Sequence, residues 1–109
     1  MNEMEMTIMQ LIIHSGDAKT HGYEAIRRIN EGDSEGADEE IKLAHDALIV
    51  AHNAQTSLLQ KEAAGEKVEI SALFVHAQDH LMTSMSELNL IEQIVELRKV
   101  VNTLLENQK

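Results

Sequence analysis

The chain has 109 residues, enough for one domain, and its 9 Lys and Arg against 19 Asp and Glu give a formal charge of −10 at pH 7. That balance argues against nucleic acid or an anionic membrane as the partner, because each needs a basic surface, and it permits basic protein partners. The absence of cysteine excludes disulfide scaffolds and thiolate chemistry, and the lack of proline with only two aromatic residues disfavours an all-β fold. The apolar runs are too short to cross a membrane and the first residues lack a basic secretory leader, so we expect a cytoplasmic, helical protein.

Two clusters of turn-forming residues, near positions 30–34 and 64–68, divide this single domain into three segments. Each segment is long enough for several helical turns, and we expect helices at roughly 5–31, 34–64 and 69–106.

Polar residues at the segment starts can cap these helices: Asp33 or Ser34 the second, and Ser71 the third. Connections this short join antiparallel neighbours, so the sequence predicts an all-α fold, an up-down-up three-helix bundle.

Each segment carries a seam of apolar and small residues at alternating spacings of three and four, which is typical of a helix with one buried face. The many Ala, Ser and Gly residues in these seams allow close helix packing. The seams are Ile8, Leu11, Ser15, Ala18, Gly22, Ala25 and Ile29; Ala37, Ile41, Ala44, Leu48, Ala51, Gln55 and Leu58; and Phe74, Ala77, Leu81, Ser84, Leu88, Ile91 and Val95.

The third segment is apolar on a second side as well. Val75, Met82 and Leu90 lie well round the helix from its seam, with Asp79 and Ser86 between them. A slender bundle can bury only one stripe of each helix, so a second strip indicates that another copy of the chain packs there. We expect a homo-oligomer with Asp79 near its interface; scattered surface hydrophobes are the alternative.

Histidines are the main candidates for chemistry, because the sequence has no Gly-rich phosphate loop, no Gly-x-Ser-x-Gly elbow and no His-Glu-x-x-His motif. His14 and His21 are seven residues apart, as are His45 and His52, which puts each pair about two turns apart and too far apart to chelate one ion. We interpret these four as ordinary surface or interface histidines.

His76, Asp79 and His80 stand at i, i+3 and i+4, so their side chains converge on one patch of a helix. Three hypotheses follow from the spacing. Two imidazoles and a carboxylate could bind a divalent metal; one imidazole could be a nucleophile tuned by its neighbours; or the three could form a polar patch without chemistry.

Longer stretches of the sequence resemble a known family. Residues 60–69, QKEAAGEKVE, and 75–82, VHAQDHLM, are similar to the IIA component of the lactose/cellobiose-type phosphoenolpyruvate-dependent sugar phosphotransferase system. Residues 11–18, LIIHSGDA, resemble the family's first helix, and the likeness extends over roughly residues 8–105. One departure is Lys19-Thr20, where the family commonly has an Arg-Ser pair.

The resemblance implies a homotrimer of three-helix bundles, a nine-helix assembly that carries phosphoryl groups. His76 would accept the group from the histidine-containing phosphocarrier protein and pass it to a cysteine of the IIB component. A membrane IIC permease would then complete uptake of a β-linked disaccharide of the cellobiose, chitobiose or lactose class. The resemblance also implies that Asp79 from each chain meets at the trimer axis around one divalent metal, usually taken as magnesium, which suits oxygen ligands.

The neighbouring residues complete this hypothesis. We expect the neutral His76 ring to attack through Nε2, His80 to donate a hydrogen bond to a phosphoryl oxygen, and Gln78, on the far side of the helix, to take no part. The competing hypothesis is a non-enzymatic metal-binding or adaptor protein that uses His76, Asp79 and His80 as ligands within one chain.

Overall fold

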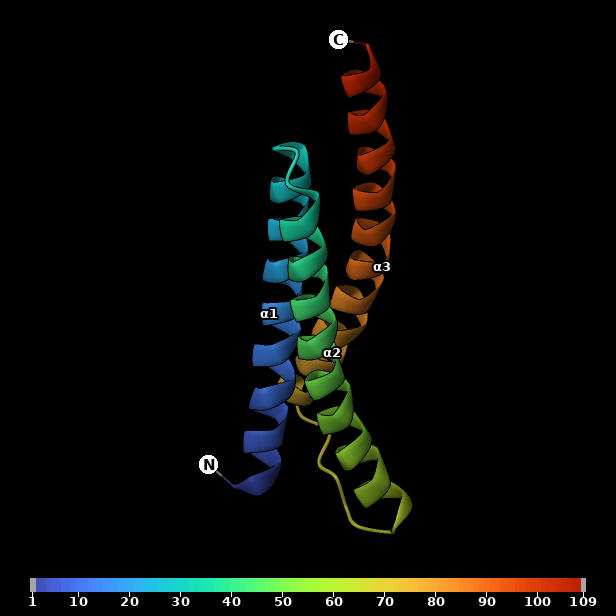
Figure 1. Ribbon diagram of the computed structural model, residues 1–109. Helices are drawn as coiled ribbons and strands as arrows, with labels where there is room; N and C mark the ends of the chain where they lie inside the picture. Colours follow the sequence, from blue (N-terminus) through green and yellow to red (C-terminus); the bar gives the residue numbers. More distant parts are fainter. Residues whose placement is uncertain (1, 109) are drawn as a thin grey trace.

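The structure, a computed structural model that describes residues 2–108, consists of three helices: α1 (Glu3–Asn30), α2 (Ser34–Ala63) and α3 (Ala72–Asn107). They run up, down and up, so α3 is parallel to α1 (Figure 1). The molecule measures 63 × 21 × 20 Å. The predicted fold class, an all-α three-helix bundle, is confirmed.

Side-chain caps define where α2 and α3 begin. Asp33 Oδ1 accepts a hydrogen bond from the Gly36 N–H at 2.9 Å, and Ser71 Oγ accepts one from the Phe74 N–H at 3.1 Å. Each cap satisfies an N–H group that has no partner within the first helical turn. Because Ser71 is extended and acts as the cap, α3 begins at residue 72, three residues later than the sequence predicts.

The core consists almost entirely of the predicted seams, with α1 packed along both other helices. All seven predicted positions of α1 are buried, and all of those of α3 except Phe74, which is half-buried. α2 departs more from the prediction, because Ile41, Leu48 and Gln55 are half-buried whereas Glu40 is buried. The bundle is therefore organised around α1.

The helices α2 and α3 meet over a short stretch only. Figure 1 shows α3 passing behind α2 near its own start and then extending past the ends of the other two helices. The outward strip of α3, on the side opposite the core, is left uncovered by its own chain: Val75, Met82 and Leu90 are exposed. Leu97, Val100 and Leu104 continue the strip and are exposed as well.

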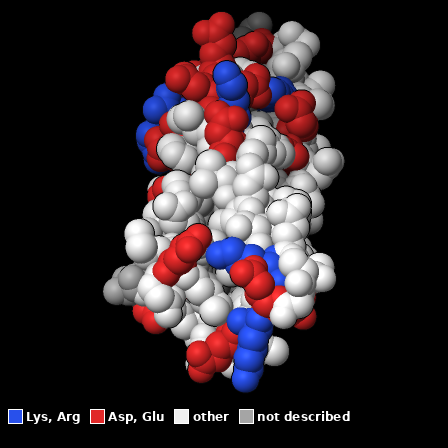
Figure 2. Space-filling model, turned by 90° about the horizontal axis from the view of Figure 1, so that it is seen from below, with Lys and Arg blue, Asp and Glu red and all other residues white. Residues whose placement is uncertain are grey.

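Figure 2 views the molecule along its long axis, from the end where α1 begins and α2 stops. In this projection, acidic and basic groups gather at two opposite edges, and uncharged side chains lie between them. No helix among residues 2–108 is long and apolar enough to cross a membrane.

Candidate functional site

His76 and His80 lie one turn apart near the start of α3, and their rings are parallel, with an interplanar angle of 5° and centroids 6.0 Å apart. His76 is exposed, whereas His80 is half-buried against α1. A Cβ placed on Gly16 would lie 3.5 Å from His80 Nε2, so a residue without a side chain lies directly beside this ring. The pair therefore has one ring open to solvent and the other held between two helices.

The helix α2 lies on the other side of α3 from His76. Gln55 Nε2 donates a hydrogen bond to Gln78 Oε1, which marks the flank of α3 that faces α2. At about 100° per residue, His76 projects roughly 160° away from Gln78 but only about 40° from His80. The exposed ring thus points away from α2, on the flank between the α1 contact and the outward strip.

Asp79 is exposed on that outward strip, about 60° round the helix from His76. Within residues 2–108 no basic side chain forms an ion pair with its carboxylate, and its carbonyl oxygen accepts a hydrogen bond from the Thr83 hydroxyl at 2.9 Å. The described residues contain no group of three His, Cys, Asp or Glu side chains that could hold a metal ion within one chain. His76, Asp79 and His80 are therefore not gathered into a three-ligand cluster among the described residues.

Lys19 of α1 forms an ion pair with Glu87, which lies two turns after His80 on α3. Its Nζ lies 3.2 Å from Glu87 Oε1, and the Tyr23 hydroxyl donates to Glu87 Oε2 at 3.0 Å. Desolvation alone would raise the pKa of Glu87, but the hydrogen bonds from Tyr23 and Lys19 hold it below its ordinary value of 4.5. The hydrogen bond to Glu87 raises the pKa of Tyr23 above 10.0. This cluster joins α1 to α3.

Three of the other four histidines pair with carboxylates, as surface and interface residues do. Those pairs are His14 with Asp17 at 3.9 Å, His21 with Glu40 at 2.7 Å, and His45 with Glu92. His52 is exposed beside a groove between α2 and α3 and makes no ion pair with the described residues.

Sequence reasoning missed the helix-to-helix contacts that frame the histidine pair. Gly16 and Gln55 belong to elements far from residues 75–82 in sequence, and no spacing rule connects them to that motif. The only sequence signal was their position on or beside the predicted seams.

Comparison with known proteins identifies the family. Residues 6–99 match the family described as the PTS system, lactose/cellobiose-specific IIA subunit. The chain is 44% identical to the lichenan-specific phosphotransferase enzyme IIA component of Bacillus subtilis, over 87% of this chain and 86% of that protein. It is 40% identical to the N,N'-diacetylchitobiose-specific EIIA component of Escherichia coli, over 89% of this chain and 84% of that protein.

Solved structures agree with this relationship. The crystal structure of the cellobiose-specific enzyme IIA from Bacillus anthracis has a TM-score of 0.90 and 40% identity, and the match covers 94% of each chain. The solution structure of the IIA(chitobiose)–HPr complex from Escherichia coli has a TM-score of 0.81 and 37% identity, over 94% of this chain and 99% of that one. The chain therefore belongs to the lactose/cellobiose-specific IIA family and is a IIA component of a sugar phosphotransferase system.

Proposed function

We propose that the chain carries a phosphoryl group on His76 in the cytoplasm, between the histidine-containing phosphocarrier protein HPr and a IIB component. The observation that carries the proposal is the exposure of the His76 ring next to the half-buried His80 ring. Donor and acceptor are both proteins, so the accepting nitrogen has to be reachable from solvent. The complex of HPr with a related IIA protein supports HPr as the donor.

The step itself is an in-line transfer between nitrogen atoms. The Nε2 lone pair of neutral His76 attacks phosphorus, the new N–P bond forms, and the N–P bond to the donor histidine breaks. In the second step the IIB cysteine thiolate attacks the same phosphorus, and His76 leaves as a neutral ring. The transition state is loose, so the protein contributes chiefly position and charge balance.

His80 is the positioning partner in this proposal. Its ring is parallel to that of His76 and is held against α1 at Gly16, so it is ordered before the phosphoryl group arrives. A ring N–H aimed at a phosphoryl oxygen would make a charge-assisted hydrogen bond. Gln78 takes no part, which accords with its hydrogen bond to Gln55 on the opposite flank.

The chain would act as a homotrimer built around the outward strip of α3. Val75, Met82, Leu90 and Leu97 are each more than half exposed, at 55–66%, which is a large apolar surface for a slender monomer. A three-fold axis along the strip would bring three Asp79 carboxylates together in apolar surroundings. A divalent cation, with magnesium the expected one, fits such an oxygen donor set and would supply charge neutralisation there.

The sugar would be a β-linked disaccharide of the cellobiose, chitobiose or lactose class, taken up through a IIC permease. The names of the relatives, which specify lichenan, N,N'-diacetylchitobiose and lactose, support this class. The IIA component does not touch the sugar in this scheme, so the class follows from the relatives rather than from any residue of this chain.

Phosphorylation by the purified donor system tests the proposal. Incubation with phosphoenolpyruvate, enzyme I and HPr should give an acid-labile, base-stable adduct that maps to His76. The His76→Ala variant should give none, whereas His45→Ala, which changes a histidine paired with Glu92, should be labelled like the wild type. An adduct that persists in His76→Ala would show that the site assignment is wrong.

A further inference from the structure

The polar residues of the outward strip of α3 recur at a fixed interval. At about 100° per residue, all members of the strip lie within roughly 40° of the direction opposite the core, and all are exposed. In chain order they are Val75, Asp79, Met82, Ser86, Leu90, Gln93, Leu97, Val100 and Leu104. The polar members Asp79, Ser86 and Gln93 are seven residues apart, about 10.5 Å along the helix, and apolar side chains separate them.

Gln93 has no side-chain hydrogen bond to any residue among 2–108. The preceding residue, Glu92, is paired with His45 of α2, but Gln93 lies on the strip between Leu90 and Leu97, which are 65% and 66% exposed. A molecule that covers these two leucines also takes the carboxamide of Gln93 out of water. A buried carboxamide without a partner is unfavourable, so the covering molecule has to supply one.

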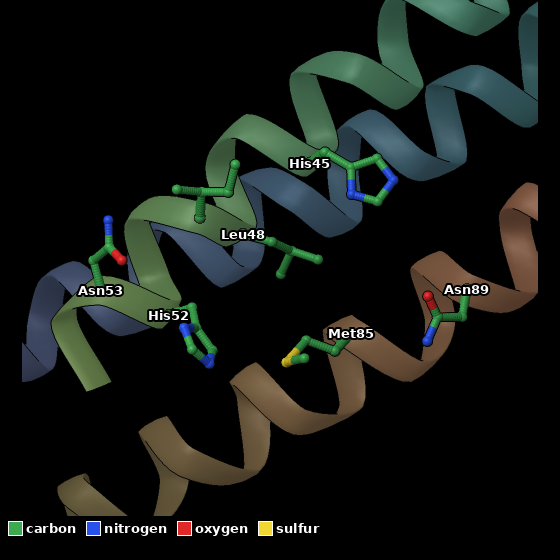
Figure 3. Close-up of a pocket in the computed structure, with 7 residues that line it drawn as sticks. His45, Leu48, His52, Asn53, Met85 and Asn89 are labelled. Atoms are coloured by element: carbon green, nitrogen blue, oxygen red, sulfur yellow. The ribbon is translucent and has the colours of Figure 1, made fainter. Parts of the chain in front are cut away.

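The helix α2 leaves this side of α3 open. A groove of about 340 Å³ lies between the two helices at the level of Met85. Figure 3 shows Leu48 and His52 of α2 directed towards Met85 of α3 across this groove. A second hollow, of about 250 Å³, is lined by Ile41 of α2 and by Gln93 itself. The chain's own α2 therefore does not cover the strip, and a partner for Gln93 has to come from another molecule.

The size of the strip favours three chains over two. Between positions 75 and 104 the strip is roughly 44 Å long, and a helix is about 10 Å across. One pair of strips face to face therefore buries on the order of 900 Å², which is below the roughly 1,200 Å² that stable interfaces reach. A closed ring of three chains has three such contacts and exceeds this value. This inference rests on the trimer of the proposed function.

We propose that the three Gln93 side chains form a closed ring of hydrogen bonds on the trimer axis, in which each Nε2–H donates to Oε1 of the next chain. A carboxamide has both a donor and an acceptor, and three-fold rotation places the same atoms at the same height in each chain. The ring therefore needs no other group. Asp79 has no hydrogen to donate, and the short side chain of Ser86 reaches less far towards the axis.

Such a ring fixes how the chains align. A displacement of one helical turn would put Gln93 opposite Leu90 or Leu97 and leave its carboxamide unpaired in apolar surroundings. A single polar residue in an apolar seam specifies register and chain number in this way, at a cost in stability. An antiparallel pair of α3 helices centred on Ser86 would also give Gln93 a partner, Asp79, but with only one contact between strips.

Hydrogen exchange of the Gln93 side chain tests the ring directly. In the ¹⁵N-labelled wild-type protein we expect one set of Gln93 side-chain signals for all three chains. The N–H in the ring should exchange at least about tenfold more slowly than the side-chain N–H of Gln60, which is exposed on α2 of the same molecule. The Gln93→Met variant identifies the signal by removing it. Exchange as fast as that of Gln60 would overturn the inference.

Two glutamine positions provide matched charge variants. Gln93→Glu replaces each donor with a carboxylate and brings three like charges together on the axis. We expect its trimer to dissociate in sedimentation at a concentration at least about tenfold higher than the wild type does. Gln60→Glu adds the same charge away from the strip and should sediment like the wild type, and Gln93→Met, which continues the apolar strip, should still assemble. Equal dissociation of the two glutamate variants would also overturn the ring.

A double-variant comparison distinguishes the ring from the antiparallel pair. In a parallel trimer Asp79 and Gln93 are about 21 Å apart along the axis, so the changes in melting temperature caused by Asp79→Leu and Gln93→Met should add when a chelator is present. In the antiparallel pair the two side chains touch, and the changes would not add. Strong coupling between the two substitutions, or a wild type that sediments as two chains, would overturn the ring.

The outcomes separate this inference from the proposed function. A trimeric wild type whose Gln93 side chain exchanges like that of Gln60 overturns the ring alone. A wild-type chain that is not labelled on His76 would instead overturn the phosphoryl carrier.

Discussion

Glu87 joins α3 to α1 through its charged side chain. Its carboxylate lies 3.2 Å from Lys19 Nζ and accepts a hydrogen bond from the Tyr23 hydroxyl at 3.0 Å, and its pKa lies below 4.5. A carboxyl group whose pKa is lower in the folded than in the unfolded protein stabilises the folded state at pH values above the pKa it has in the unfolded chain. That contribution is lost as the pH falls through the lowered value.

We therefore expect Glu87→Gln to lose stability near neutral pH, by on the order of 0.5 kcal/mol because the pair is partly exposed. The loss relative to the wild type should shrink as the pH falls below about 4.5, which urea unfolding at pH 7 and pH 3 would measure. Tyr23→Phe removes one of the two hydrogen bonds that lower the pKa of Glu87 and keeps the Lys19 pair, so its loss should be smaller and should shrink in the same way as the pH falls. An equal difference at both pH values would contradict the expectation.

Single residues also show what the sequence could and could not predict about the site. The spacing of His76, Asp79 and His80 was sufficient to place them on one patch, because helical geometry is local. Their surroundings were not predictable in the same way. The contact of Gly16 with His80 depends on how two helices pack, and nothing in either segment alone specifies it.

At the scale of the helix, the seams were predictable because burial follows the helical period. Ala, Ser and Gly occupy four of the seven buried positions of α1, and all seven are buried as predicted. Glu40 is the exception: a carboxylate is not expected in a core. Its burial depends on His21 at 2.7 Å and Arg28 at 3.7 Å, two partners from α1 that a reading of α2 alone does not reveal.

Gly22 lies where α1 packs closely against α3. A Cβ there would lie 2.9 Å from Ile91 Cδ1 and 3.6 Å from Leu88 Cδ1, and both of these side chains are buried. We expect Gly22→Val to lower the free energy of unfolding by about 2 kcal/mol, because a branched side chain overpacks this contact. Urea unfolding would measure the loss.

Gly16→Ala provides the comparison within the same helix. Its Cβ would make only an ordinary contact with His80 Nε2 at 3.5 Å, and alanine favours the helix by about 1 kcal/mol over glycine. It should be at least as stable as the wild type. A Gly22→Val protein with unchanged stability would show that the Ile91 and Leu88 side chains of α3 move aside at little cost.

For the whole molecule, the outward strip of α3 links stability to assembly. A single chain leaves this strip in water over the length of an elongated bundle, and Asp79 interrupts its apolar character. Burial of apolar surface favours assembly, while three carboxylates brought together oppose it. In the proposed trimer a bound cation shifts this balance, so magnesium should raise the melting temperature of the wild type.

Asp79→Leu separates the two effects. A leucine continues the apolar strip and removes the repulsion, so we expect the variant to remain trimeric in sedimentation experiments and to melt at or above the temperature of the metal-free wild type. Its melting temperature should no longer respond to magnesium or to a chelator. Ser86→Leu is the control, because it adds the same side chain to the strip while keeping the carboxylate, and it should retain the response. A monomeric wild type at micromolar concentration, or one bound ion per chain instead of one per three chains, would contradict the axial site.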